Sequence, residues 1–115
     1  MRYFMLDADH SLIEVHESNL NVWKLWMYSN IPSRMVGRRE IVEDYLINTV
    51  FIGQHDDNTD PAPFITAVFT QETQPVFTAR WRTWEEAEAG HRTIEVRTFL
   101  RWVIEREHEG YPLNN

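Results

Sequence analysis

The sequence predicts an α+β fold: an antiparallel meander of strands, a short Trp-containing helix near the N-terminus and one long C-terminal helix. Three observations carry this prediction. Short runs typical of strands, separated by turn residues, recur over most of the first 82 residues. The sequence TWEE, beginning at Thr83, is typical of a helix start, and the helix reaches about residue 107. A chain of 115 residues is long enough for one hydrophobic core but not two, so we expect a single domain, 1–115.

The N-terminal part is predicted to form a hairpin and then the short helix. RYFMLD and SLIEVH are typical of short strands, so residues 2–16 form the hairpin. Ser18 is expected to cap a helix over residues 19–29, and Pro32 to end it. Three large apolar side chains share one face of this helix and are expected in the core: Trp23, Trp26 and Met27.

Four further strands are predicted as two antiparallel pairs, 34–42 with 45–53 and 64–70 with 76–82. The run 45–53 is mostly apolar, which is typical of a central strand. In the last strand, alternation gives one buried face with Phe77, Ala79 and Trp81. The other face carries Arg80 and Arg82, where we expect an anion to bind.

The C-terminal helix carries two apolar faces. Thr83 and Glu86 form a capping box at its start. The first face comprises Trp84, Ala87, His91 and Ile94, and the second comprises Val96, Phe99, Leu100, Val103 and Ile104. One core requires only one such face. The second therefore predicts a homo-oligomer that associates through this helix.

Arg97 and Arg101 have i, i+4 spacing, so they project together from one side of the helix. Two interpretations stay open: salt bridges with Glu105 or a neighbouring Glu, or a grip on a phosphate group. Ten of the eleven basic residues are Arg, which makes planar two-pronged contacts with phosphate. A GC-rich genome is the alternative explanation of that bias. His91 is either a core or interface histidine or a ligand-binding one.

Composition excludes several classes of function. A net charge of −7 argues against a non-specific nucleic-acid binder, which needs a basic face. The absence of Cys excludes disulfides, thiolate zinc sites and a Cys nucleophile. No run is long enough for a membrane span or typical of a signal peptide, so we expect a cytoplasmic protein. We expect neither an enzyme nor a cofactor, because no catalytic or phosphate-loop motif is found.

The stretch VFIGQHDDNTDPAPF, residues 50–64, contains a polar loop. It is either a solvated connection or a lid over a ligand. Its His-Asp-Asp run matches no calcium loop, so no metal site is expected.

The blocks NTVFIGQHDD, PAPFITAVF and RWRTWEEAEAGH resemble a pattern in small phage and prophage proteins. That pattern has a strand ending in Thr-Val-Phe-Leu-Gly, an Asp-His loop, a Pro-Pro exit and Thr-Trp-Glu-Glu-Ala at the last helix. The resemblance covers roughly residues 46–95. This chain departs from it at residues 54–57, where QHDD replaces a Gly-rich Asp-His segment, which leaves the ligand's identity open. The resemblance implies that the loop 54–63 closes over a bound nucleotide, with hydrogen bonds from Gln54 and His55 and a stacking surface on Phe64.

The order of elements is also similar to that of the Thoeris anti-defence sponges of phages. This resemblance implies a non-enzymatic protein that sequesters a cyclic nucleotide immune signal, of the cyclic ADP-ribose type or a cyclic oligonucleotide, in the infected bacterial cell. It also implies symmetric oligomers with ligands between protomers. Some members bind phosphates with paired arginines on the C-terminal helix, and Arg97 and Arg101 have that spacing.

Two alternative functions remain. The acidic charge suits a protein inhibitor of a host nuclease, of the anti-CRISPR or nucleic-acid-mimic kind. A metal-dependent phosphodiesterase would use His55, Asp56 and Asp57.

Overall fold

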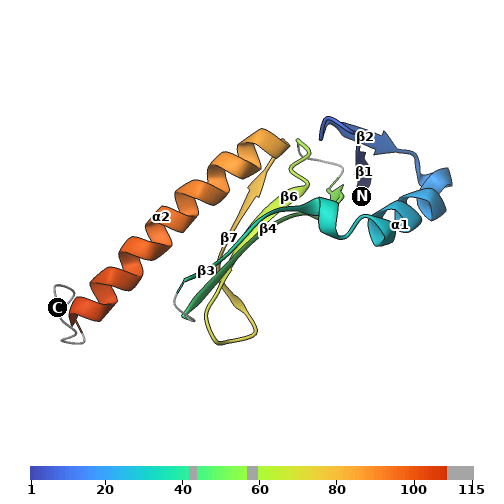
Figure 1. Cartoon of the computed structure of the whole chain (residues 1–115). Helices are drawn as coiled ribbons and strands as arrows, with labels where there is room; N and C mark the ends of the chain where they lie inside the picture. The colour runs from blue at the N-terminus through green and yellow to red at the C-terminus, as the bar shows by residue number, and fades with distance from the viewer. Residues whose placement is uncertain (42–43, 57–59, 109–115) are drawn as a thin grey trace.

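A computed structural model describes residues 1–41, 44–56 and 60–108. The predicted α+β fold, with its antiparallel strands, short Trp-containing helix and long C-terminal helix, is confirmed (Figure 1). The strands are β1 (Arg2–Leu6), β2 (Leu12–Val15), β3 (Met35–Ile41), β4 (Tyr45–Phe51), β5 (Gln54–His55), β6 (Phe64–Phe69) and β7 (Pro75–Trp81). The helices are α1 (Leu20–Ser29) and α2 (Trp84–His108), with 3-10 turns at Glu17–Asn19 and Pro32–Arg34.

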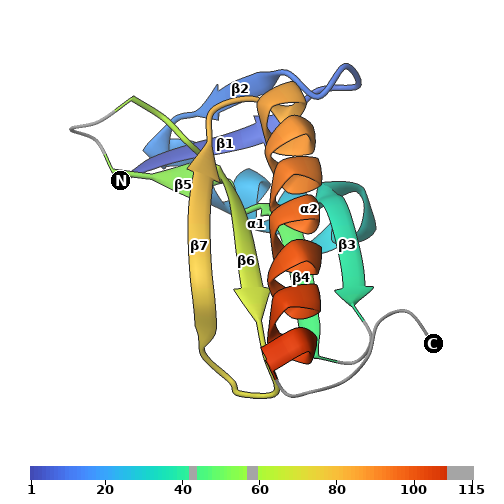
Figure 2. The same cartoon turned by 90° about the vertical axis from the view of Figure 1, so that its left-hand side faces the viewer.

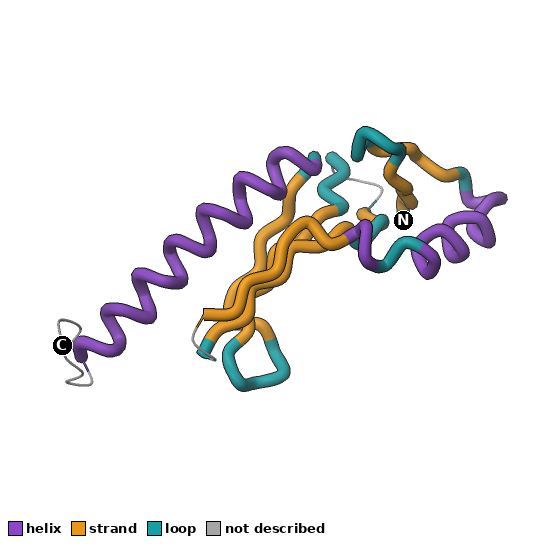
Figure 3. Tube along the Cα trace, in the orientation of Figure 1, coloured by secondary structure: helices purple, strands orange, loops and turns teal. Residues whose placement is uncertain are grey.

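The strands form two antiparallel sheets. The main sheet has the order β3-β4-β6-β7, and α2 runs along one of its faces (Figure 2). The small sheet has the order β2-β1-β5 and lies with α1 beyond one end of the main sheet (Figures 1 and 3). The molecule is therefore elongated, with principal extents of 59 × 28 × 27 Å.

Strand register decides which side chains face α2. Thr49 of β4 pairs with Thr66 of β6 and with Gly37 of β3, and directly paired residues share a face. Along β4, alternate residues are buried under α2: Tyr45, Ile47, Thr49 and Phe51. The residues between them point to the opposite face and are partly exposed.

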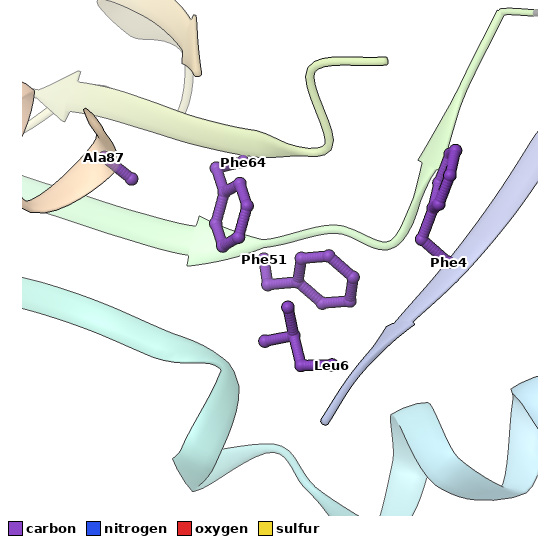
Figure 4. Close-up of a cluster of buried hydrophobic side chains, with 5 residues drawn as sticks. All are labelled: Phe4, Leu6, Phe51, Phe64 and Ala87. Atoms are coloured by element: carbon purple, nitrogen blue, oxygen red, sulfur yellow. The ribbon is translucent and has the colours of Figure 1, made fainter. Parts of the chain in front are cut away.

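Two hydrophobic clusters form the core. The first joins the small sheet to the start of α2 and comprises Phe4, Leu6, Phe51, Phe64 and Ala87 (Figure 4). The second lies under the middle of α2 and comprises Ile41, Tyr45, Ile47, Val68 and Ile94. Trp81 packs against both. A Cβ on Gly90 would lie 2.3 Å from the Trp81 ring, so only glycine lets α2 approach this closely.

The N-terminal hairpin is confirmed, and the prediction for Ser18 is wrong. Ser18 lies inside a 3-10 turn, where its amide donates to Nδ1 of His16 at 3.1 Å. The N-cap of α1 is Asn19, whose side chain makes no capping bond. The imidazole of His16 therefore caps the 3-10 turn Glu17–Asn19. The Ser18 hydroxyl, by contrast, was expected to cap α1. α1 ends at Ser29, three residues before Pro32 begins the next turn.

The prediction for α2 is confirmed in its start, its length and its two faces. The Glu86 amide donates to the Thr83 hydroxyl at 3.1 Å, which is half of the expected capping box. Ala87, His91 and Ile94 are buried, whereas the second apolar face is about half exposed: Val96, Phe99, Leu100 and Ile104. Among the described helices, none is both long and apolar enough to cross a membrane.

The far end of α2 is tied to the turn between β3 and β4. The indole of Trp102 donates to Oδ2 of Asp44 at 2.5 Å, and Arg106 lies 3.3 Å from the same oxygen. These contacts hold the last turns of α2 beside the sheet, while Phe99, Leu100 and Ile104 on its outer face stay about half exposed.

Candidate functional site

A groove runs between α2 and β7 on the helix-covered face of the main sheet. We call it the α2–β7 groove. Its volume is about 130 Å³. Val68 and Ile94 form its apolar floor, and the Phe77 ring on the edge strand is 48% exposed. The full lining comprises Tyr45, Val68, Val76, Phe77, Ile94, Arg97, Thr98 and Arg101.

The two predicted arginines border this groove together, but they differ in their partners. Nε of Arg101 lies 3.3 Å from a Glu105 carboxylate oxygen. Its side chain is nevertheless 72% exposed, so this ion pair is weak. For Arg97, no hydrogen bond or ion pair is found among the residues that the structure describes. The salt-bridge interpretation therefore holds for Arg101 only.

Tyr45 fixes the carboxylate that Arg101 contacts. Its hydroxyl donates to both oxygens of Glu105, at 3.0 and 2.9 Å. Burial raises the pKa of Tyr45, and the hydrogen bond and negative charge of Glu105 raise it further. The hydroxyl therefore remains a donor at neutral pH. If a ligand draws Arg101 away, Glu105 keeps its bond from Tyr45.

A second pocket lies at the end where the small sheet joins the main one. This loop-end pocket is open, has a volume of about 600 Å³ and brings together Gln54, His55 and Arg80. The other lining residues are Met1, Ile52 and Asp56. Gln54 and His55 form β5 and pair with β1, so this part of the predicted lid belongs to the small sheet. The expectation for Asp57 lies outside the described residues.

Phe64 and His91 are core residues, which corrects the expectation that they touch a ligand. Phe64 is fully buried, and its ring centroid lies 5.1 Å from that of Phe51. Only 6% of His91 is exposed, and both of its ring nitrogens have partners, Thr49 at 2.7 Å and Glu95 at 2.8 Å. Both side chains face the space between the sheet and α2, so a ligand cannot reach them.

The expected arginine face of β7 is only partly present. Arg80 lies on the sheet face away from α2, since it pairs with Ile65, and its guanidinium donates to the Ala62 carbonyl at 3.3 Å. Arg82 lies beyond the last residue of β7 and forms an exposed ion pair with Asp60 at 3.6 Å. Of the predicted site residues, Gln54, His55 and Arg80 therefore line the loop-end pocket and Arg97 and Arg101 line the α2–β7 groove, whereas Arg82 lines neither.

Of the eight residues that line the α2–β7 groove, the sequence predicted only Arg97 and Arg101 as site residues; Tyr45, Phe77 and Thr98 are among those it missed. Thr98 could have been found, because it lies one turn from Ile94 on the same side of α2. No spacing rule could place Tyr45 beside Thr98, because they come from separate elements that meet only in the packed molecule.

In the part of the chain that the structure describes, no three His, Asp or Glu side chains are grouped to hold a metal ion. Comparison of the chain with protein-family models, curated proteins and solved structures gave no match.

Proposed function

We propose that the protein binds and sequesters a cyclic nucleotide signal in the α2–β7 groove without cleaving it. The ligand is of the cyclic ADP-ribose type or a cyclic oligonucleotide. One observation carries the proposal: the guanidinium of Arg97, which has no partner among the described residues, borders the same groove as the exposed ring of Phe77. A nucleotide offers the two matching groups, a phosphate and a flat aromatic base.

Different parts of the groove suit the base and the phosphate of a nucleotide. Stacking of a base on an aromatic ring stabilises binding by about 1–3 kcal/mol. The walls beside Phe77 are apolar, and Arg97 and Arg101 lie one helical turn apart at the rim. A volume of about 130 Å³ is small beside ordinary ligand pockets of about 300–1,000 Å³. One base therefore enters, while the phosphates stay at the rim against the arginines.

The biological part of the proposal is the removal of an immune signal in a phage-infected cell. It is supported by the resemblance of the 46–95 region to phage proteins and by the arginine spacing shared with the anti-defence sponges. Sequestration requires tight binding and an unchanged ligand, and both are measurable.

The test is calorimetric titration and thermal unfolding with cyclic ADP-ribose isomers and cyclic di- and trinucleotides. A ligand at a hundredfold its dissociation constant should add about 2.7 kcal/mol to the free energy of unfolding. The double variant Arg97→Ala, Arg101→Ala should bind at least about tenfold more weakly, because hydrogen bonds to charged groups contribute about 1.5–3 kcal/mol each. Arg92→Ala is the matched control, since Arg92 is an exposed arginine of the same helix.

Different results would redirect the proposal. If none of these ligands binds, the proposal fails, and salt-sensitive capture of a host nuclease would favour the inhibitor alternative. If the double variant binds normally and Arg80→Ala does not, the loop-end pocket is the site. If the ligand is recovered hydrolysed, the protein is an enzyme, and metal analysis then tests the phosphodiesterase alternative.

A further inference from the structure

Thr98 of α2 is a buried polar residue whose hydroxyl has no partner. In the described chain, three of the other buried polar side chains satisfy one another: Thr49, Thr66 and His91. Thr98 is only 7% exposed, yet no hydrogen bond of its hydroxyl is found among the residues that the structure describes. Buried polar groups are normally paired, so this hydroxyl requires an explanation.

Thr98 differs in this respect from the other threonine of the same helix. A threonine inside a helix usually points to solvent or donates to the carbonyl one turn earlier. The Thr93 hydroxyl does the latter, donating to the Ala89 carbonyl at 3.1 Å. Thr98 lies instead on the side of α2 that faces the sheet, where it lines the α2–β7 groove. The helix backbone therefore does not satisfy its hydroxyl.

The Thr98 hydroxyl can be reached from the groove. Some polar atoms of the described chain, such as Oδ1 of Asn48, are both unpaired and fully enclosed, but the Thr98 hydroxyl is not one of them. It therefore keeps a small accessible surface, and this surface opens into the groove that Thr98 lines. The neighbouring Arg97 borders the same groove and also lacks a partner among the described residues.

The remaining polar groups of the groove already have partners. The Tyr45 hydroxyl donates to Glu105, and Arg101 lies 3.3 Å from the same carboxylate. The rest of the lining is apolar: Val68, Val76, Phe77 and Ile94. A plain hydrocarbon ring could fill this space, but it would leave the Thr98 hydroxyl unpaired. The hydroxyl therefore favours a flat ring with hydrogen-bonding atoms on its edge.

We propose that Thr98 makes the groove selective for a nucleobase over an apolar ring, through a hydrogen bond to the polar edge of the base. This inference rests on the proposed function and adds to it a specificity-determining residue. A hydroxyl can rotate to donate to a ring nitrogen or to accept from an amino group. A site built around a buried polar group rejects a ligand without the matching group, because the buried group then stays unpaired.

The position of Thr98 relative to the arginines suits a nucleotide. Arg97 is its neighbour in sequence, and Arg101 lies three residues later, about 4.5 Å along the helix axis. The ribose separates the base of a nucleotide from its phosphate, so a base inside the groove leaves the phosphate at the rim. Phe77, across the groove on β7, is 48% exposed and offers its ring for stacking.

Two small phosphate compounds test the selectivity by nuclear magnetic resonance titration of the full chain. AMP carries a phosphate and a base, whereas benzyl phosphate carries a phosphate and a plain ring. We expect Thr98→Val to bind AMP about three- to tenfold more weakly than wild type and benzyl phosphate equally well. Thr98→Ser keeps the hydroxyl and should keep most of the affinity for AMP. Thr93→Val is the matched control and should bind both compounds as wild type does.

The stability of the free protein separates a binding role of Thr98 from a structural one. Valine has the shape of threonine and removes a buried hydroxyl that has no partner. Thr98→Val should therefore unfold at the same urea concentration as wild type or at a higher one. A clearly lower unfolding midpoint would overturn the proposal, because it would mean that the hydroxyl stabilises the fold.

The binding results also distinguish this proposal from the proposed function. If Thr98→Val binds AMP as tightly as wild type while Arg97→Ala combined with Arg101→Ala weakens it, Thr98 has no role and the proposed function stands. If wild type does not bind AMP, the proposal on Thr98 fails as well. The calorimetric titration with cyclic nucleotides then decides whether the proposed function fails with it.

Discussion

Nδ1 of His91 lies 2.7 Å from the hydroxyl of Thr49, and this contact begins a chain of hydrogen bonds from α2 into the centre of the main sheet. Thr49 lies 2.6 Å from the Thr66 hydroxyl, which accepts from the Trp81 indole at 2.8 Å. On the other side, Nε2 of His91 lies 2.8 Å from Glu95. In the neutral imidazole Nε2–H donates to the Glu95 carboxylate, so Nδ1 accepts from the Thr49 hydroxyl, and Thr49 accepts from Thr66.

These buried hydrogen bonds predict that Thr49→Val lowers the stability of the protein. The substitution keeps the shape but removes the hydroxyl, so His91 and Thr66 each lose a buried partner. We expect the free energy of unfolding to fall by about 1–3 kcal/mol, as measured by urea denaturation. Thr93→Val is the control, because the Thr93 hydroxyl bonds within an exposed turn of α2 and its loss should change stability by less than about 0.5 kcal/mol. Equal effects of Thr49→Val and Thr93→Val would show that the buried hydrogen bonds do not stabilise the core.

Tyr45→Phe should have a pH-dependent effect on stability. Near pH 7 it removes the hydrogen bond to Glu105, which we expect to cost about 1–2 kcal/mol because that carboxylate is partly in water. The pKa of Tyr45 is raised in the folded state, so the folded protein holds the phenolic proton more tightly than the unfolded chain. This stabilisation is complete below the ordinary tyrosine pKa of about 10 and is lost as the pH rises through the raised value.

The measurement for Tyr45 is therefore a comparison of denaturant unfolding at two pH values. The difference between wild type and Tyr45→Phe should be largest near pH 7 and should narrow above about pH 10. A difference that stays constant, or grows with pH, would contradict the role assigned to this hydroxyl.

The exposed face of α2 predicts that Phe99→Glu combined with Val103→Glu lowers the mass of the oligomer. Phe99 is about half exposed and stacks on Trp102 at a centroid distance of 6.0 Å. Charges placed in a dry helix contact are costly. Light scattering should show a smaller particle with unchanged helix content, whereas Arg92→Glu should keep the wild-type mass. A wild-type monomer would refute association through this face.

The groove arginines should matter for binding and little for folding. Exposed ion pairs contribute about 0–1 kcal/mol, and of these two arginines only Arg101 forms one with a described residue. The double variant Arg97→Ala, Arg101→Ala should therefore unfold within about 1 kcal/mol of wild type. If it melts much earlier and its oligomers dissociate, the two arginines form an interface between copies.

Local sequence was enough to predict most of the elements. Thr83 and Glu86 predict the start of α2 because capping involves atoms only three residues apart. The mostly apolar run at 45–53 predicts β4 because such runs are typical of central strands. Helical spacing also predicted the second apolar face of α2, because it places Phe99 and Val103 on a different side of the helix from His91.

Only tertiary structure decided which predicted site residues can meet a ligand. Phe64 follows a polar loop and His91 lies on a helix, but register and helix packing bury both in the core. Gln54 and His55 were predicted to lie in a loop, but they pair with β1 and form a strand. Arg97 gained Phe77 and Tyr45 as neighbours because β4, β7 and α2 pack together, and contacts between residues so far apart in sequence leave no local pattern.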